Sequence, residues 1–549
     1  MSTKRRKFRS IAGHVPMRAV AAHGAVVRQI RQLDLAGTEQ VMDGATRRRN
    51  AIGMRGVALL AAALAGLALC AAGLWRLEAA RDGVSITQLQ AGTTPMTVYR
   101  REGAAAAPVV VIAHGFAGSR QFMEAYALTL AQAGYLAVSL DFEGHGRNPT
   151  PMSGDVTRVD GTTRKLMSEI GRVTDAALAL PGADGRVALL GHSMASDIIV
   201  RQALADPRVS ATVAISMFSE AVTANAPRNL LIITGEWESA LRGDALRNLK
   251  RADPAAREGD TVGDPAAGSG RRAVVAPGVE HVSVLYSTTA LREARDWLDQ
   301  VFGRTSSGPV VATGGAIALL LAGIVQLAWP LTELLPKSDA APRPIPFRNL
   351  AIATLLPAVV TPLALRFVNT RFLPVLVADY LAVHLFVYGA LSLALLRLMG
   401  VRFGRVAWLA ALALAAYGIA IFGGALDRYV ASFMPIPARL PIIAAIAVGA
   451  VPAMLADSIA NQSGHAALWR TLWIRAAFLA SLGGAVALDL RRLFFLLIII
   501  PVIVLFFIVF GLIGGCVGRR TGSPMAEGIG LGLILAWSLG VSFPMFLPG

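Results

Sequence analysis

Long uncharged runs of apolar residues lie at two places in the chain and are absent from the stretch between them. The first run is residues 56–75, bounded by Arg55 and Arg76. A helix of this length rises about 30 Å, which matches the hydrocarbon core of a bilayer. The pattern therefore predicts one membrane-spanning signal anchor at 56–76.

The second set of apolar runs extends from about residue 306 to 549, which we call the helical region. Seven runs are long enough to span a bilayer: 305–332, 349–365, 372–396, 406–426, 440–456, 493–518 and 528–549. An eighth stretch, 476–488, is short for a span. We therefore expect an all-α transmembrane bundle of seven or eight helices.

Residues 80–305, which we call the α/β domain, have a different pattern. Short apolar runs rich in β-branched residues begin near 108, 135, 186, 229 and 272, and amphipathic stretches alternate with them. This alternation is typical of an α/β fold with a mostly parallel sheet flanked by helices. The polar stretch 239–270 is interpreted as a surface flap, either a plain loop or one that recruits substrate, and the connection 216–228 has only about a dozen residues.

Composition and charge agree with a membrane protein. The chain is 54% hydrophobic and only 16% charged, which excludes a disordered protein, and its net charge is +17. Residues 1–55 form a basic tail with twelve Lys and Arg against three acids. Because cytoplasmic segments are enriched in Lys and Arg, the tail is expected inside and the α/β domain on the outer, periplasmic face of the cytoplasmic membrane. Nucleic acid is not expected as a partner, and the side of the C-terminus stays open.

The two cysteines, Cys70 and Cys516, lie inside apolar runs, where a thiol behaves as a small hydrophobe. No disulfide and no cysteine metal site are therefore expected. No other metal site and no cofactor are expected either.

The candidate chemistry centres on Ser193 in the run Gly191-His192-Ser193-Met194-Ala195. This serine stands at a tight turn between a predicted strand and a predicted helix. A turn of this kind projects the hydroxyl above the sheet, and the start of the helix offers free backbone N–H groups to a developing oxyanion.

This turn resembles the nucleophile elbow of the α/β-hydrolase family, His114-Gly115-Phe116 resembles the family's oxyanion segment, and the loop 141–146 is similar to the family's loop after the next strand. The resemblance implies that the backbone N–H groups of Phe116 and Met194 form the oxyanion hole. It also implies a base at His281 and an acid at Glu238, after the strands that begin near 272 and 229. Glu236 is the alternative acid, and His145 is expected to be structural.

In this interpretation Ser193 forms an acyl-enzyme, His281 moves the proton, and Glu238 orients the imidazole. We expect a membrane-embedded serine hydrolase, esterase-like or lipase-like, that cleaves ester bonds in a small molecule or lipid and contacts membrane lipids. Two alternatives stay open: an acyltransferase of the same fold, or a non-catalytic hydrolase-like domain on a membrane transporter or assembly protein.

Overall fold

The computed structural model describes residues 54–155, 159–338, 343–375 and 377–547. The predicted basic tail thus lies outside the described residues except at its last two positions. The chain forms two compact units, 1–64 and 65–549. The described part of the first unit is the start of the apolar helix Met54–Ala79. All further description concerns the second unit.

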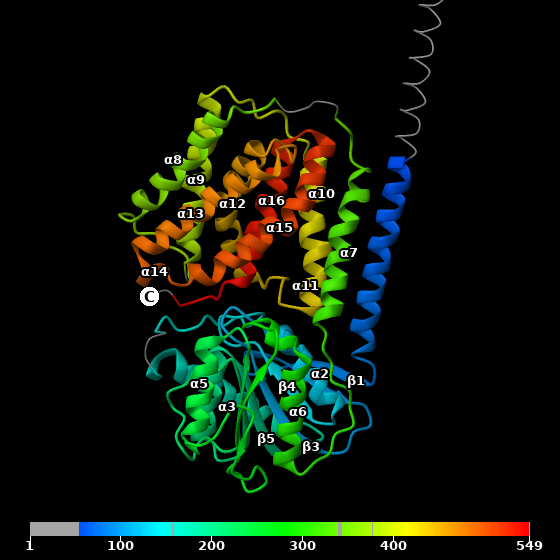
Figure 1. The fold of residues 1–549 in the computed structure, drawn as a ribbon, viewed down its shortest axis with the longest axis vertical. Helices are drawn as coiled ribbons and strands as arrows, with labels where there is room; N and C mark the ends of the chain where they lie inside the picture. Colours follow the sequence, from blue (N-terminus) through cyan, green and yellow to red (C-terminus); the bar gives the residue numbers. More distant parts are fainter. Residues whose placement is uncertain (1–53, 156–158, 339–342, 376, 548–549) are drawn as a thin grey trace, which may run out of the picture. The chain divides into compact units, whose positions relative to one another are not determined.

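A nine-stranded sheet forms the centre of the α/β domain (Figure 1). Its strand order is β1-β2-β4-β3-β5-β6-β7-β9-β8, and the strands from β4 to β9 in this order run parallel. The edge strand β1 pairs antiparallel with β2, β2 with β4, and the other edge strand, β8, with β9. The strands are β1 Val84–Ala91, β2 Thr94–Arg101, β3 Ala107–Ala113, β4 Leu136–Leu140, β5 Ala183–His192, β6 Val209–Ile215, β7 Leu230–Gly235, β8 Thr261–Val262 and β9 Arg271–Ala276.

Helices cover both faces of the sheet because alternate strand residues point to opposite sides. In β3, Val110 and Ile112 pack with α2 and α6, whereas Val109 and Val111 pack with α3 and α4. This arrangement confirms the predicted α/β class. The helices are α2 Glu124–Gln132, α3 Arg164–Leu178, α4 Met194–Ala205, α5 Ser239–Lys250 and α6 Thr288–Phe302, with short turns η1 Arg120–Met123, η2 Val159–Thr163 and η3 Ser283–Tyr286.

The interpretation of 239–270 as a surface flap was wrong for its first part. Residues Ser239–Lys250 form helix α5, whose Ala245 and Leu249 are buried against the sheet. These two residues are four apart and so share one helix face.

Nine helices of the described residues are long and apolar enough to cross a membrane, as expected of a multi-pass membrane protein. Eight of them follow the α/β domain: α7 Gly314–Thr332, α8 Phe347–Leu365, α9 Ala378–Leu398, Trp408–Tyr429, Pro437–Ala460, α13 Leu468–Leu488, α15 Leu496–Thr521 and α16 Pro524–Ser542. The helix Trp408–Tyr429 consists of α10 Trp408–Ala416, η4 Tyr417–Phe422 and α11 Gly423–Tyr429. The helix Pro437–Ala460 consists of η5 Pro437–Arg439 and α12 Leu440–Ala460. A short helix, α14 Leu490–Leu493, precedes α15. The uncertain stretch 476–488 is the second half of α13.

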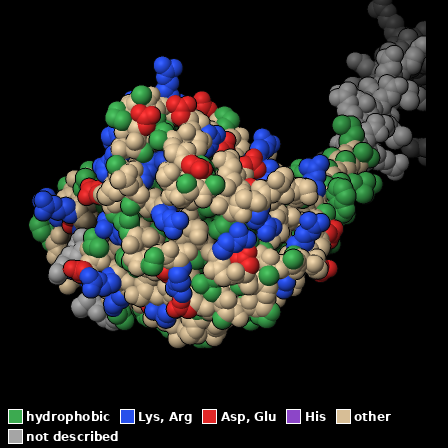
Figure 2. Space-filling model, turned by 90° about the horizontal axis from the view of Figure 1, so that it is seen from below, with side chains coloured by type: hydrophobic (Ala, Val, Ile, Leu, Met, Phe, Trp, Pro, Cys, Tyr) green, Lys and Arg blue, Asp and Glu red, His purple; other side chains and the backbone are tan. Residues whose placement is uncertain are grey.

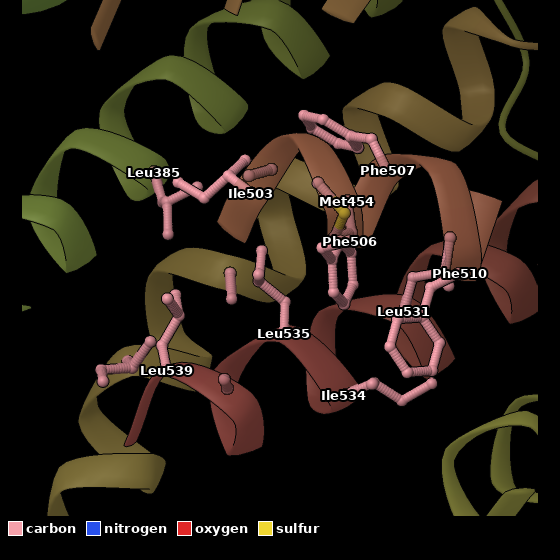
Figure 3. Close-up of a cluster of buried hydrophobic side chains, with 14 of the residues drawn as sticks. Leu385, Met454, Ile503, Phe506, Phe507, Phe510, Leu531, Ile534, Leu535 and Leu539 are labelled. Atoms are coloured by element: carbon pink, nitrogen blue, oxygen red, sulfur yellow. The ribbon is translucent and has the colours of Figure 1, made fainter. Parts of the chain in front are cut away.

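The core of the helical region lies between α9, α12, α15 and α16, where large apolar side chains interlock (Figure 3). Small residues allow close contact between the helices. A Cβ atom at Gly449 of α12 would lie 2.0 Å from the carbonyl oxygen of Ala382 in α9, and one at Gly532 of α16 would lie 2.6 Å from the Cα of Val451.

Two loops of the α/β domain contact the helical region, and both follow parallel strands. After β3, the Oγ of Ser119 accepts from the backbone N–H of Ser432 at 3.1 Å. After β4, Arg147 forms an ion pair with Asp427 at 2.6 Å. The carboxyl edge of the sheet therefore faces the helices.

The segment that follows α16 joins the loop after β4. The N–H of Met545 donates to the carbonyl of Gly144 at 2.9 Å, and the N–H of Met152 donates to the carbonyl of Met545 at 2.8 Å. Phe546 is buried among apolar residues of the α/β domain. The described C-terminal end thus lies on the same side of the helices as the α/β domain.

Arg439 joins the two parts of the fold and is only 1% exposed. Its guanidinium donates to the carbonyl of Gly144 at 3.0 Å, and to those of Phe543 and Gly540 at 2.6 and 3.2 Å. Arg439→Met is expected to lower the free energy of unfolding by about 3 kcal/mol, because buried carbonyls lose their donors. The thermal transition of the purified full chain in detergent measures this loss. Arg366→Met, at an exposed position, is the control, and an equal shift in both variants would contradict the prediction.

Candidate active site

Ser193 occupies a sharp turn between β5 and α4. Its backbone dihedrals are φ 54° and ψ −117°, a conformation that few non-glycine residues adopt. The N–H of Ser193 donates to the carbonyl of Ile215 in the adjacent strand at 2.9 Å, which fixes the turn to the sheet. The helix passes so close that a Cβ at Gly191 would lie 3.0 Å from the carbonyl oxygen of Ala195. The chain here forms the strained strand-to-helix elbow that presents a hydroxyl above a sheet.

The structure brings Ser193, His281 and Glu238 together in one chain of hydrogen bonds. His281 Nε2 lies 2.8 Å from Ser193 Oγ, and His281 Nδ1 lies 2.5 Å from Glu238 Oε1. Each residue follows the carboxyl end of a parallel strand, β5, β7 or β9, and these ends share one edge of the sheet. Because Nδ1 faces a carboxylate, the imidazole carries its proton there and leaves Nε2 free to accept the serine proton.

The second oxygen of Glu238 is held in place by two further donors. Glu238 Oε2 accepts from the N–H of Gly235 at 2.6 Å and from Ser216 Oγ at 2.8 Å. Burial raises the pKa of Glu238, but the hydrogen bonds from His281, Gly235 and Ser216 outweigh it and hold the pKa below the usual value for glutamate. Glu238 therefore remains a carboxylate at neutral pH. The alternative acid, Glu236, is exposed and accepts from the N–H of Gly278 at 2.7 Å.

The residues expected to supply the oxyanion donors are Phe116, in a turn that lies against Ser193, and Met194, which follows Ser193 in the chain. Gly115 to Gly118 form a tight turn, closed by the N–H of Gly118 and the carbonyl of Gly115 at 3.1 Å, in which Phe116 is the second residue. The N–H of the second residue takes no part in the closing bond of such a turn. A Cβ at Gly115 would lie 3.0 Å from Ser193 Cβ, so the turn lies against the serine. Met194 is the first residue of α4, where an N–H has no acceptor within the helix.

Three other histidines hold the loops around the site. His114 contacts the carbonyl of Gly115 through Nδ1 at 2.7 Å and accepts from the N–H of Phe142 through Nε2 at 3.1 Å. His145 contacts the carbonyl of Glu143 at 2.9 Å. His192 Nε2 lies 2.8 Å from the carbonyl oxygen of His281 and so holds the loop that carries the base.

The pKa of His192 is lowered in the folded protein, and this makes the stability of the fold depend on pH. Burial, and then the neighbouring His281, lower the pKa of His192 from 6.5 to about 4. The folded protein therefore binds fewer protons here than the unfolded chain between pH 4 and 6.5. The contribution of His192 to stability is complete above pH 6.5 and decreases as the pH falls, by about 3 kcal/mol in total.

His192→Gln is expected to reduce the loss of thermal stability between pH 7 and pH 4.5, because glutamine keeps a donor for the carbonyl of His281 but does not titrate. Melting curves of both full-length proteins in detergent at the two pH values test this expectation. An equal loss in the native chain and in the variant would contradict it.

Exposed large apolar side chains also lie close in sequence to the site residues, and the sequence analysis did not single them out. Trp237, Phe218 and Val282 are 68%, 49% and 45% exposed and lie within two residues of Glu238, Ser216 and His281. From the helical region, the ring of Phe495 lies 4.8 Å from that of Phe116, centroid to centroid. No local motif marks Phe495, because only the fold brings it to the site.

In the described part of the chain, no group of three or more His, Cys, Asp or Glu side chains lies close enough to hold a metal ion.

Residues 104–250 match the model of the family described as serine aminopeptidase, S33. The match runs from just before β3 to the end of α5. It includes Phe116, Ser193, Met194 and Glu238 and ends before His281.

No curated protein matches the chain. Solved structures similar to it include a membrane phospholipase A described as a novel bacterial virulence factor, with 16% identity, a TM-score of 0.30, and coverage of 46% of this chain and 99% of that one. An epoxide hydrolase from Vigna radiata has 14% identity and a TM-score of 0.28, and the match covers 40% of this chain and 98% of that one. A predicted CIB-like hydrolase from Thermoplasma acidophilum has 15% identity, a TM-score of 0.31 and coverage of 39% and 97%.

Proposed function

We propose that the chain is a membrane-embedded serine hydrolase that cleaves acyl ester bonds, and the match of residues 104–250 to the S33 family model supports a hydrolase of the α/β-hydrolase fold. The observation that carries the proposal is the chain of hydrogen bonds from Ser193 through His281 to Glu238. A serine hydroxyl is a weak nucleophile by itself, and an adjacent, oriented base is what activates it.

The reaction proceeds in two halves. Ser193 Oγ attacks the ester carbonyl carbon while His281 Nε2 takes the serine proton. The oxyanion accepts hydrogen bonds from the N–H groups of Phe116 and Met194, and Glu238 stabilises the imidazolium. Collapse breaks the bond to the alcohol oxygen, which leaves with the proton from His281. Water then attacks the acyl-enzyme by the same route and releases the carboxylic acid.

The proposed location is the cytoplasmic membrane, with the α/β domain on its outer, periplasmic face. The nine apolar helices and the basic tail 1–55 support it. In this place the partners of the site are ester-containing small molecules or lipids, and membrane lipids surround the helices.

An acyltransferase of the same fold remains the second candidate, since the same residues serve it and only the acceptor differs. The non-catalytic alternative expects the three side chains to lie apart, and the hydrogen bonds between them argue against it.

The test is the turnover of p-nitrophenyl butyrate by the purified full chain in detergent. An acyl-enzyme predicts a burst of p-nitrophenol equal to the enzyme concentration, followed by steady turnover. Release of butyrate identifies a hydrolase. Transfer of the acyl group to an added alcohol, with little butyrate formed, identifies a transferase. The absence of both burst and turnover from well-folded protein would contradict the proposal.

A further inference from the structure

We propose that the substrate is an ester-linked lipid of the surrounding bilayer, whose acyl chain reaches Ser193 along the N-terminal end of α15 and past Phe495. This inference rests on the proposed function, since it names the substrate of the same site.

The edge of the sheet that carries the site also faces the helical region. Ser193, Glu238 and His281 follow the carboxyl ends of parallel strands, and so do the loops that contact Asp427, Ser432 and Arg439 of the helical region. Asp427 and Arg439 lie near the ends of two apolar helices, and Ser432 lies in the short connection between these helices. The site therefore stands at the height where the spans leave the hydrocarbon core.

A row of exposed apolar side chains lies on α15. Their spacing of three or four residues places them on one helix face, whereas Ile503, Phe506 and Phe510 on another face are buried. Exposed apolar residues on a spanning helix contact acyl chains. On α15 the row consists of Ile498, Val502, Leu505, Ile508 and Leu512, and the exposed Phe494 lies in the turn that precedes this helix.

Contacts between aromatic rings join this row to the site. The ring of Phe494 lies 5.8 Å from that of Phe495, and the ring of Phe495 lies 4.8 Å from that of Phe116. Phe116 belongs to the turn that lies against Ser193. An apolar path thus leads from the lipid-facing side of α15 to the proposed oxyanion turn.

The surface of the α/β domain agrees with this direction of approach. The exposed Trp237, Phe218 and Val282 lie on the edge that carries the site. The opposite face of the domain mixes acidic and basic side chains, as a surface in contact with water does (Figure 2). In a bilayer lipid the acyl chains lie in the core and the ester groups at its boundary, which is the height of the site.

The experiment uses the full chain reconstituted in phosphatidylcholine vesicles that contain a fluorogenic long-chain acyl ester. The rate on this lipid is compared with the rate on water-soluble p-nitrophenyl acetate. Phe495→Ala is expected to lower the lipid rate about tenfold more than the acetate rate, because it removes the apolar surface of one phenyl ring. Phe495→Leu, which keeps most of that surface, should retain a ratio within about twofold of native.

The matched control is Phe386→Ala, at an exposed position of α9, which should leave both rates unchanged. An equal fall in both rates for Phe495→Ala would overturn the inference, because Phe495 would then act only by holding the turn. An unchanged ratio would overturn it as well. If the native chain cleaves acetate but not the lipid, only this inference fails, whereas a native chain that cleaves neither contradicts the proposed function itself.

Discussion

Ser193→Ala is expected to lower ester hydrolysis by about five to six orders of magnitude. The substitution removes the atom that forms the acyl-enzyme and leaves the elbow, whose shape depends on the backbone bond to Ile215, intact. Steady-state turnover of p-nitrophenyl butyrate by the purified full chain measures the loss, and the burst of p-nitrophenol should disappear with it.

Ser168→Ala is the matched control, since Ser168 is exposed on α3 and bonds only to its own helix. It should keep native turnover. Equal melting temperatures of the native chain and both variants show that folding is unchanged. Turnover by Ser193→Ala within about tenfold of native would remove Ser193 from the proposed mechanism.

Glu238→Gln is expected to lower turnover by about three to four orders of magnitude. Glutamine has nearly the same shape, but it is neutral and does not stabilise the imidazolium. Its amide group also favours the wrong tautomer of His281. Because the pKa of Glu238 lies below the usual value, the native carboxylate keeps its charge at neutral pH, and kcat of the native chain at pH 6 to 8 should show no titration of this group.

Glu236→Gln tests which of the two candidate acids, Glu238 or Glu236, orients His281. Glu236 accepts from Gly278 and is exposed, so its replacement should change turnover by less than about threefold. A large loss in Glu236→Gln together with retained activity in Glu238→Gln would assign the acid to Glu236.

The α/β domain could be predicted from the sequence because local patterns determine most of it. The buried strands β3 and β5 are runs of β-branched and aliphatic residues that end in turns rich in glycine. Ser193 could be predicted because it stands at a tight turn between a strand and a helix, whereas Glu238 and His281 were predicted from the family resemblance, which expects an acid and a base after the strands that begin near 229 and 272.

Polar residues left the span at α13 open and concealed helix α5. In α13, Arg470 and Arg475 interrupt the apolar run. The structure shows their side chains donating to the carbonyls of Ile345 and Phe507, so their charges do not end the helix. Helix α5 carries several charged residues on its exposed side, which hide the apolar spacing of Ala245 and Leu249.

The contacts between the α/β domain and the helical region could not be predicted because they join residues far apart in the sequence. Nothing near Phe495 indicates that its ring packs on Phe116, and nothing near Arg439 indicates that it donates to Gly144. Such contacts depend on how the α/β domain and the helical region pack against each other. The spacing of hydrophobic residues along the chain does not indicate this packing.

The most direct test of the central claim is labelling of membranes with a fluorophosphonate, which reacts with activated serines. We predict strong labelling of the native full chain and its loss in both Ser193→Ala and His281→Ala, because the serine reacts only when the base is in place. Unlabelled, well-folded native protein, or labelling that persists in Ser193→Ala, would contradict the account.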